Sequence, residues 1–409
     1  MSIPRRTRRT LAVAATWAAT RCLLLLCVFK VLVLPGPDPT SDVHVIYQGW
    51  SQVLGTGTYP LDDVTWQYPP AAALAILSPA VLPFLDYATA FFVLALLADT
   101  LVFALLMYAA GRPGKCLNGA WMWTLGVPLL GPTAYARYDL MVTAVAVAAL
   151  LAGARHPRTL GALAAFGALL KVWPALLLLR APRRALITAA ACATMLLAAC
   201  VAAAPGAFAF LTFQRERGTE VESLGALVFH VARQFGWRGR VQLTYGSVEF
   251  LGPYVPLVSA LALVLSLLAL GWLVLWRVRS PGPWRPSTLA DAAFTAVLLF
   301  TTTSRVISPQ YLVWLVGLGA VCLVFRRGPM LRPAQLVLAA TGVTCLEFPV
   351  WFAHVVASDW LGVLLLVVRN GLLVAACVLA CRHLWRSASS VRAPLAVRAA
   401  RTAAPSATR

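Results

Sequence analysis

Long apolar runs recur along the whole chain and leave little room for a soluble fold. Stretches near the length of a membrane span lie at 11 to 34, 87 to 110, 185 to 204, 254 to 276 and 360 to 381. Shorter runs lie at 118 to 134, 139 to 154, 288 to 304, 310 to 325 and 334 to 350. Because a spanning helix needs about 20 apolar residues, the pattern predicts an all-α, polytopic bundle of about 10 to 12 membrane helices.

Composition and charge agree with a membrane protein. Hydrophobic residues make up 60% of the chain and charged residues 12%, which a soluble surface could not accommodate. Basic residues accumulate in the cytoplasmic loops of membrane proteins, so the arginines at 5 to 9 predict a cytoplasmic amino terminus in a plasma membrane. The cytoplasmic clusters of basic residues account for the net charge of +20, so the expected partner is the lipid bilayer and no nucleic acid is required.

The chain is interpreted as one integral membrane domain over 1 to 386, followed by a basic tail. Two polar segments interrupt the apolar pattern, a first outer loop at 35 to 86 and a larger second outer loop at 205 to 253. Residues 387 to 409 are rich in Ala, Ser and Arg, which predicts a disordered cytoplasmic segment. Pro35-Gly36-Pro37 ends the first span without a small-residue cleavage site, so we expect an anchored helix.

Two segments break the simple alternation of spans. Residues 69 to 85 carry Pro79 and Pro83 within an apolar run, and we expect an outer juxtamembrane or re-entrant helix. Residues 158 to 180 have arginines at both ends and Lys171-Val172-Trp173-Pro174 in the middle. This predicts a broken helix pair that rises from the cytoplasm and returns to it, with Lys171 at its apex. Irregular backbone at membrane depth occurs only where it is buried in protein or lines a wet cavity.

Other motif classes are missing from the sequence. The nine cysteines lie in or beside apolar runs and form no CxxC pair, and no HxxE spacing suggests a metal site. No Walker lysine loop and no GxGxxG after a strand occurs, which argues against a nucleotide-driven pump.

Six short motifs occur in a specific order between about residues 40 and 315. They are Asp42 with Tyr47 and Trp50, Gly57-Thr58-Tyr59-Pro60, Tyr68-Pro69-Pro70, Ala136-Arg137-Tyr138-Asp139, Leu170-Lys171-Val172-Trp173-Pro174 and Ser308-Pro309-Gln310-Tyr311-Leu312. In this order they resemble glycosyltransferase family 87, which belongs to the GT-C class of integral membrane glycosyltransferases. The resemblance implies a GT-C type bundle with outer juxtamembrane helices.

The resemblance also implies an activity. It is the inverting transfer of a hexose, with mannose favoured, from a polyprenyl-phosphate donor to a lipid or glycan acceptor on the outer face. Asp42 matches the catalytic position of the family and is the candidate general base. A helix cap or a solvated loop acid is the alternative for Asp42, and Asp62 and Asp63 are the fallback bases.

Cations are the candidates for binding the donor phosphate. We nominate Arg137, Lys171 and Arg305, because arginine can hold a phosphate through two parallel hydrogen bonds and lysine acts as a point charge. An interfacial side chain that reaches toward lipid headgroups is the alternative for each. Arg215 and Arg217 of the second outer loop could serve the same end, although an exposed charge cluster is usually only solvated.

The remaining candidates are substrate contacts. They are Tyr47, Tyr59, Asp62, Asp63, Tyr68, Asp139 and Gln310. Aromatic side chains can stack against sugar or prenyl groups, but they are also enriched at membrane interfaces without any ligand. No cofactor is expected; a divalent cation stays open because some relatives of the class use one. Arg369 lies within the last span and requires a partner that the sequence does not identify.

Two other functions stay open at this point. A transporter or flippase of a lipid-linked sugar would also need a cationic groove and many spans, but such proteins often show inverted repeats, and none is found here. A ligase or polymerase of surface polysaccharide would use the same donor chemistry with a larger acceptor.

Overall fold

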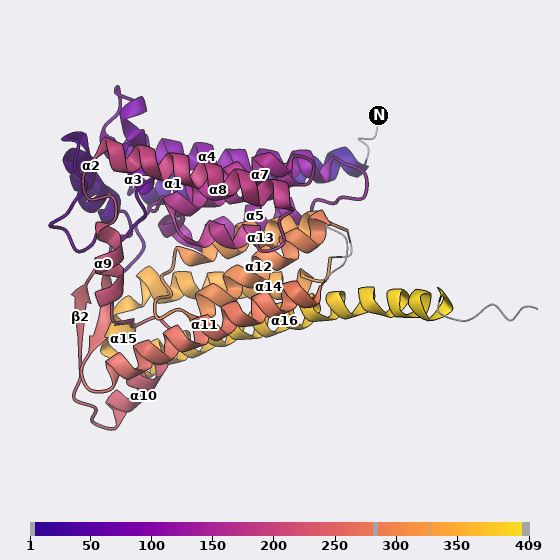
Figure 1. Ribbon diagram of the computed structural model, residues 1–409. Helices are drawn as coiled ribbons and strands as arrows, with labels where there is room; N and C mark the ends of the chain where they lie inside the picture. Colours follow the sequence, from indigo (N-terminus) through magenta and orange to yellow (C-terminus); the bar gives the residue numbers. More distant parts are fainter. Residues whose placement is uncertain (1–4, 281–284, 327, 403–409) are drawn as a thin grey trace, which may run out of the picture.

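The computed structural model describes residues 5 to 280, 285 to 326 and 328 to 402. Within these ranges, six helical segments are long and apolar enough to cross a membrane. They are α1 (Arg5–Val28), α4 (Tyr87–Ala110), α8 (Arg183–Ala203), α11 (Val255–Arg279), α14 (Leu331–Cys345) continued by η5 (Leu346–Val350), and α16 (Trp360–Thr402). The helices run side by side as one bundle (Figure 1). The predicted all-α, multi-pass architecture is confirmed.

Shorter helices fill the space between the long ones. They are α5 (Asn118–Leu129), η3 (Gly131–Ala134), α6 (Asp139–Gly153), α7 (Pro157–Leu170), η4 (Trp173–Leu178), α12 (Pro286–Thr303) and α13 (Tyr311–Val324). Helix α13 is buried along nearly its whole length and packs against α4, α5, α6, α12 and α14. It is therefore the central helix of the bundle.

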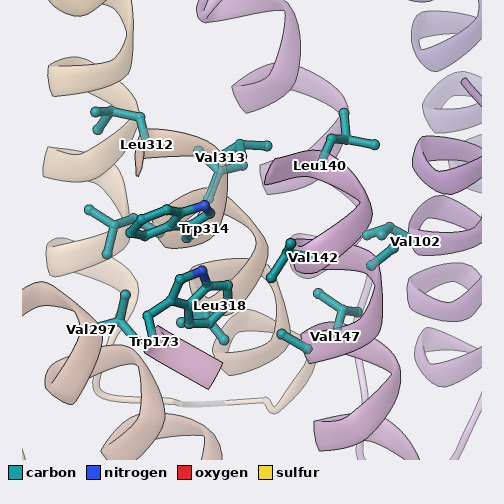
Figure 2. Close-up of a cluster of buried hydrophobic side chains, with 14 of the residues drawn as sticks. Val102, Leu140, Val142, Val147, Trp173, Val297, Leu312, Val313, Trp314 and Leu318 are labelled. Atoms are coloured by element: carbon teal, nitrogen blue, oxygen red, sulfur yellow. The ribbon is translucent and has the colours of Figure 1, made fainter. Parts of the chain in front are cut away.

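Close packing around α13 holds the bundle together. Trp173 of η4 stacks on Trp314 of α13 with ring centroids 5.3 Å apart, and both indoles are buried. Figure 2 shows these rings beside Leu318 and beside valines of the neighbouring helices. Lipid tails are as apolar as leucine, so helices associate in a bilayer mainly through van der Waals packing of this kind.

The helix is interrupted between α7 and η4, where the sequence predicts a broken helix pair. Pro174 has no N–H to donate, and in a continuous helix its ring would clash with the carbonyl of Leu170. Lys171 is extended, with φ of −158° and ψ of 136°, and ends α7. Gly161 of α7 packs against the start of α8, and Arg180 after η4 donates to the carbonyl of Ser280 at the end of α11. The segment therefore returns to the level at which α7 began.

Short elements gather at one end of the bundle, called the sheet end here. The first polar segment forms η1 (Asp42–Tyr47), α2 (Gln48–Gly55), α3 (Ala72–Leu77) and η2 (Ser78–Val81). The second forms α9 (Ala209–Glu216), β1 (Thr219–Glu220), α10 (Leu227–Gln234), β2 (Arg240–Thr244) and β3 (Ser247–Leu251), and α15 (Phe352–Ala357) joins them. The region at 69 to 85 is a short helical segment, too short to cross a bilayer.

The three strands form a small antiparallel sheet in the order β1-β3-β2, which our sequence analysis did not predict. Tyr245 and Gly246 connect β2 to β3, and both have positive φ, 51° and 73°. This is the geometry of a two-residue hairpin whose twist matches the strands. A single Gly in a long polar loop is too weak a signal to reveal the hairpin in advance.

The basic tail, for which disorder stays a prediction, begins within the last helix. Helix α16 continues to Thr402, and residues 403 to 409 lie outside the described part of the chain. Alanine and arginine have high helix propensity, so a segment rich in both can extend a helix that is already formed. Helix α16 runs away from the sheet end, and the amino terminus also lies at the opposite end (Figure 1).

Candidate functional site

A cavity of about 370 Å³ opens at the sheet end of the bundle. Five parts of the chain meet around it: η1 with α2, the segment before α3, the break after α7, α9 with the hairpin tip, and the segment between α12 and α13. The polar and aromatic residues that line it include Asp42, Tyr47, Trp50, Gln67, Tyr68, Lys171, Trp173, Gln214, Arg217, Tyr245, Arg305, Ser308, Gln310, Tyr311 and Trp314.

Asp42, the first residue of η1, lies at the cavity and is held by Arg137. Oδ2 of Asp42 is 2.8 Å from Nη2 of Arg137, and the Asp42 side chain is 29% exposed. Nη1 of Arg137 donates to the carbonyls of Pro39 and Ala136, at 2.9 Å each. Oδ1 of Asp42 accepts no hydrogen bond in the described part of the chain, so this oxygen can face a substrate.

Lys171 lies in a cage of four aromatic rings at the break after α7. Nζ is 2.7 Å from Oδ1 of Asp139, the same oxygen that accepts from Nε1 of Trp314 at 2.7 Å. The rings are those of Tyr68, Tyr138, Tyr311 and Trp314, whose centroids lie 5.0 to 5.5 Å from Nζ. Ring faces attract a cation, so the cage and Asp139 together hold the ammonium at the wall of the cavity.

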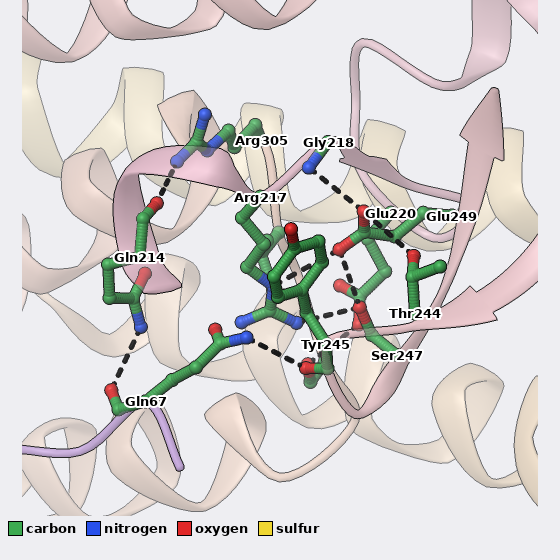
Figure 3. Close-up of polar contacts among 12 residues, drawn as sticks. Gln67, Gln214, Arg217, Gly218, Glu220, Thr244, Tyr245, Ser247, Glu249 and Arg305 are labelled. Carbon is green, nitrogen blue, oxygen red and sulfur yellow. Dashed lines mark hydrogen bonds and ion pairs between the residues drawn. The ribbon is translucent and has the colours of Figure 1, made fainter. Parts of the chain in front are cut away.

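Arg305, between α12 and α13, is a third charged group at the cavity. It donates to the carbonyl of Gln214 (Figure 3). Its Nη1 lies 3.4 Å from Oγ of Ser259. Its side chain pairs with no carboxylate in the described part of the chain. Burial, and then the positive charge of nearby Arg217, lower the pKa of the Arg305 guanidinium. An arginine remains charged nonetheless, so the site favours an anion.

The other candidates divide into two groups. Tyr47, Tyr68 and Gln310 line the cavity. Tyr59, Asp62 and Asp63 do not belong to its described lining: the Tyr59 hydroxyl donates to the carbonyl of Pro70 at 3.2 Å, and Asp62 is exposed. Asp63 accepts from Trp50 Nε1 at 2.7 Å and from the Thr65 hydroxyl, and these contacts fix a turn.

Sequence reasoning underrated Arg217 and did not find the partner of Arg369. Arg217 lines the cavity and its side chain is only 11% exposed, so it is not a solvated loop charge. Arg369 forms a two-contact ion pair with Glu347, at 2.8 and 2.9 Å, and lies 3.5 Å from Glu222. The sequence did contain a signal for this pair: Glu347 lies in an apolar run, and a buried arginine such as Arg369 requires a carboxylate partner.

Comparison with known families identifies the family of the chain. The model of glycosyltransferase family 87 matches residues 66 to 309, more than half of the chain. The chain belongs to glycosyltransferase family 87. As a member of glycosyltransferase family 87 it is a glycosyltransferase, and its helices make it a multi-pass membrane protein. No curated protein and no solved structure matches the chain.

The region matched to glycosyltransferase family 87 contains part of the cavity. Arg137, Lys171 and Arg305 lie within it, whereas Asp42 precedes it and Gln310 follows it by one residue. The role of Asp42 therefore rests on its position in the cavity and on the motif order, not on the matched region.

Proposed function

We propose that this glycosyltransferase moves a hexose, specifically mannose, from a polyprenyl-phosphate donor to a hydroxyl of a lipid-linked or cell-envelope glycan, with inversion at the anomeric carbon. The observation that carries the proposal is that one carboxylate, Asp42, lines the same cavity as Lys171 and Arg305. A transfer of this kind needs one base for the acceptor and positive charge for the leaving group.

The balance of charges fits a phosphate leaving group. A glycosidase needs a second, protonated carboxyl group because an alkoxide leaves poorly. A phosphate leaves as a stable anion and needs only cations beside it. Lysine and arginine supply this charge, so the proposed step uses no cofactor.

In the proposed step, Oδ1 of Asp42 accepts the proton of the acceptor hydroxyl. The acceptor oxygen forms a bond to the anomeric carbon as the bond from that carbon to the phosphate oxygen breaks. The electron pair leaves with the polyprenyl phosphate, whose charge Lys171 and Arg305 stabilise. Attack from the face opposite the phosphate gives inversion.

Arg137 has a different role in this proposal from the phosphate contact that we first expected. Within the described chain, its hydrogen bonds and its ion pair are to Asp42 and to two carbonyls. We therefore assign it to hold Asp42 in a fixed orientation. Asp139 holds Lys171 in the same way, while Tyr47, Tyr68 and Gln310 contact the sugar or the acceptor.

The orientation of the chain supports an active site on the outer face of the plasma membrane. Both the amino terminus and the extension of α16 lie opposite the sheet end (Figure 1). The arginines at 5 to 9 and those at 382 to 401 are thus at one end of the bundle. Since such residues concentrate in the cytoplasm, the sheet end and its cavity face outward.

The test is transfer of radiolabelled mannose from polyprenyl-phosphate-mannose into a lipid extract by membranes with matched expression. Asp42→Asn keeps the size of the side chain and removes the base, and we expect activity to fall about 100- to 10,000-fold. Asp86→Asn is the matched control, because Asp86 is exposed and caps α4, a role that asparagine also performs. It should keep wild-type activity.

Three other outcomes would redirect the assignment. Near-normal activity of Asp42→Asn with loss in Asp62→Asn or Asp63→Asn would move the base to Asp62 or Asp63. Transfer of glucose or arabinose in place of mannose would change the sugar but keep the mechanism. No transfer by the wild-type protein from any prenyl-phosphate sugar would overturn the proposal and favour transport.

A further inference from the structure

The tip of the hairpin β2–β3 lines part of the cavity, and residues of the hairpin hold an arginine there. Arg217, which follows α9, lines the cavity together with Tyr245 and Gly246 at the hairpin tip. Its Nη2 donates to Oγ of Ser247 at 2.7 Å, and Nε lies 3.3 Å from Oε1 of Glu249 (Figure 3). Within the described chain, Nη1 of Arg217 makes no hydrogen bond.

Glu249 is the residue that fixes this arrangement. Besides Arg217, it accepts hydrogen bonds from the Gly218 N–H at 2.9 Å, the Thr244 hydroxyl at 3.2 Å and the Ser247 hydroxyl at 3.0 Å. Its side chain is 1% exposed and does not belong to the described lining of the cavity. A carboxylate with this many donors is rigid, because each oxygen has its partners.

Hydrogen bonds join the hairpin to other parts of the cavity wall. Nε2 of Gln67 donates to the carbonyl of Tyr245 at 3.0 Å, and Nε2 of Gln214 donates to the carbonyl of Gln67 at 3.0 Å. Arg305 in turn donates to the carbonyl of Gln214. Figure 3 shows this chain of contacts from the hairpin tip to Arg305. The position of Arg217 is therefore set relative to the rest of the cavity.

The charges at the cavity are unbalanced. Among its described lining residues, Lys171, Arg217 and Arg305 are cations, and Asp42 is the carboxylate. Asp42 is paired with Arg137, which lies behind it. Arg217 forms an ion pair with Glu249 and feels the charge of the nearby Glu220, whereas Arg305 pairs with no carboxylate in the described part of the chain. The positive charge of Arg217 acts on the half-buried Arg305, and an anion in the cavity would relieve this repulsion.

We propose that Arg217 binds the anionic group of the substrate through its unused Nη1, and that Glu249 is a positioning residue that aims Arg217 into the cavity. The identity of that group as the phosphate of a prenyl-phosphate donor rests on the proposed function. The sheet thus has a specific task, which is to bring a cation from the second polar segment to a cavity built mainly by the bundle.

The test measures binding and does not depend on transfer. Farnesyl phosphate is the probe, farnesol is its uncharged counterpart, and the full-length purified protein is titrated with each. We expect the wild type to prefer farnesyl phosphate, and Arg217→Gln to lower this preference about 10- to 100-fold, the loss of one or two charge-assisted hydrogen bonds. Arg238→Gln is the matched control, because Arg238 is exposed on the same polar segment.

Glu249→Gln and Ser247→Ala test the positioning role. Each should lower the preference for farnesyl phosphate about 3- to 10-fold, since Arg217 loses one of its two anchors but keeps its charge. Binding of farnesol should not change. This phosphate-specific loss separates positioning from a structural role, because general unfolding would weaken both ligands and lower the thermal unfolding midpoint.

Several results would overturn the inference. Wild-type preference in Arg217→Gln would mean that Arg217 does not contact the anion. Equal binding of farnesol and farnesyl phosphate by the wild type would mean that the cavity has no anion site, even if sugar transfer is observed. If the wild type transfers no sugar but prefers farnesyl phosphate through Arg217, the proposed function fails while this inference stands.

Discussion

The Lys171 ammonium lies 2.7 Å from Oδ1 of Asp139, and four aromatic rings surround it. Both charges are almost fully buried, since the two side chains are 11% and 2% exposed. The pair joins the break after α7 to the start of α6. It thus fixes a charged group at the edge of the bundle where the cavity begins.

Removing one member of this pair should destabilise the protein more than removing both. Asp139→Asn leaves a buried cation without its carboxylate, and we expect a loss of about 3 to 5 kcal/mol. The double variant Asp139→Asn with Lys171→Met contains no unpaired charge and should recover much of that loss. Thermal unfolding of the purified variants measures the difference. A double variant less stable than Asp139→Asn would contradict this account of the pair.

Kinetics can separate the two roles considered for Arg137. If Arg137 orients Asp42, Arg137→Gln should lower kcat about 10- to 100-fold with little change in the donor KM. Arg137→Lys should recover part of the rate, because a lysine can still contact Oδ2. A large rise in the donor KM at unchanged kcat would instead indicate direct phosphate binding. Arg238→Gln, in the exposed part of the second polar segment, serves as the control.

The pH dependence of stability should report on Glu222. Burial, and then the charges of Glu347 and Glu220, raise the pKa of Glu222 well above its ordinary value of 4.5. Above pH 4.5 the unfolded chain loses this proton while the folded protein keeps it. The stability associated with Glu222 is therefore fully present below pH 4.5 and falls as the pH rises toward the raised pKa.

Glu222→Gln imitates the protonated form and should remove this loss. We expect the unfolding midpoint of Glu222→Gln to match the wild type in acid and to exceed it increasingly toward neutral and alkaline pH. Distant groups titrate equally in both proteins, so the difference between the two curves reports on Glu222 and on the carboxylates Glu347 and Glu220 that interact with it. A constant difference at all pH values would show that the folded and unfolded pKa values of Glu222 are the same.

Contact between α7 and α8 should depend on a glycine. A Cβ added at Gly161 would lie 2.2 Å from the carbonyl oxygen of Ala185, a backbone atom that cannot move aside. Gly161→Ala should therefore cost about 1 to 3 kcal/mol through overpacking. Gly271→Ala in α11 is the matched control, because its Cβ would meet open space. We expect it to leave thermal unfolding unchanged or to raise the midpoint slightly, since alanine favours helix.

The parts of the fold that the sequence predicted depend on local signals. The lengths of the apolar runs located α4, α6, α8, α11 and α13 to within a few residues. Pro174 indicated the break after α7, because its effect on a helix acts within one turn. The hairpin at 240 to 251 was not predicted, because its sequence lacks a strong local signal. Strand β3 pairs with β2 and with β1, and the sequence of a polar loop does not reveal this pairing.

The sequence alone therefore determined the class of protein, the break at Lys171 and the order of the motifs that indicate glycosyltransferase family 87. Only the tertiary structure decided which charges meet. Arg137 is 95 residues from Asp42 in the chain, and Arg369 is 22 residues from Glu347 and 147 from Glu222. Ion pairs at such separations form when packed helices bring them together, and hydropathy, proline positions and motif spacing carry no record of that packing.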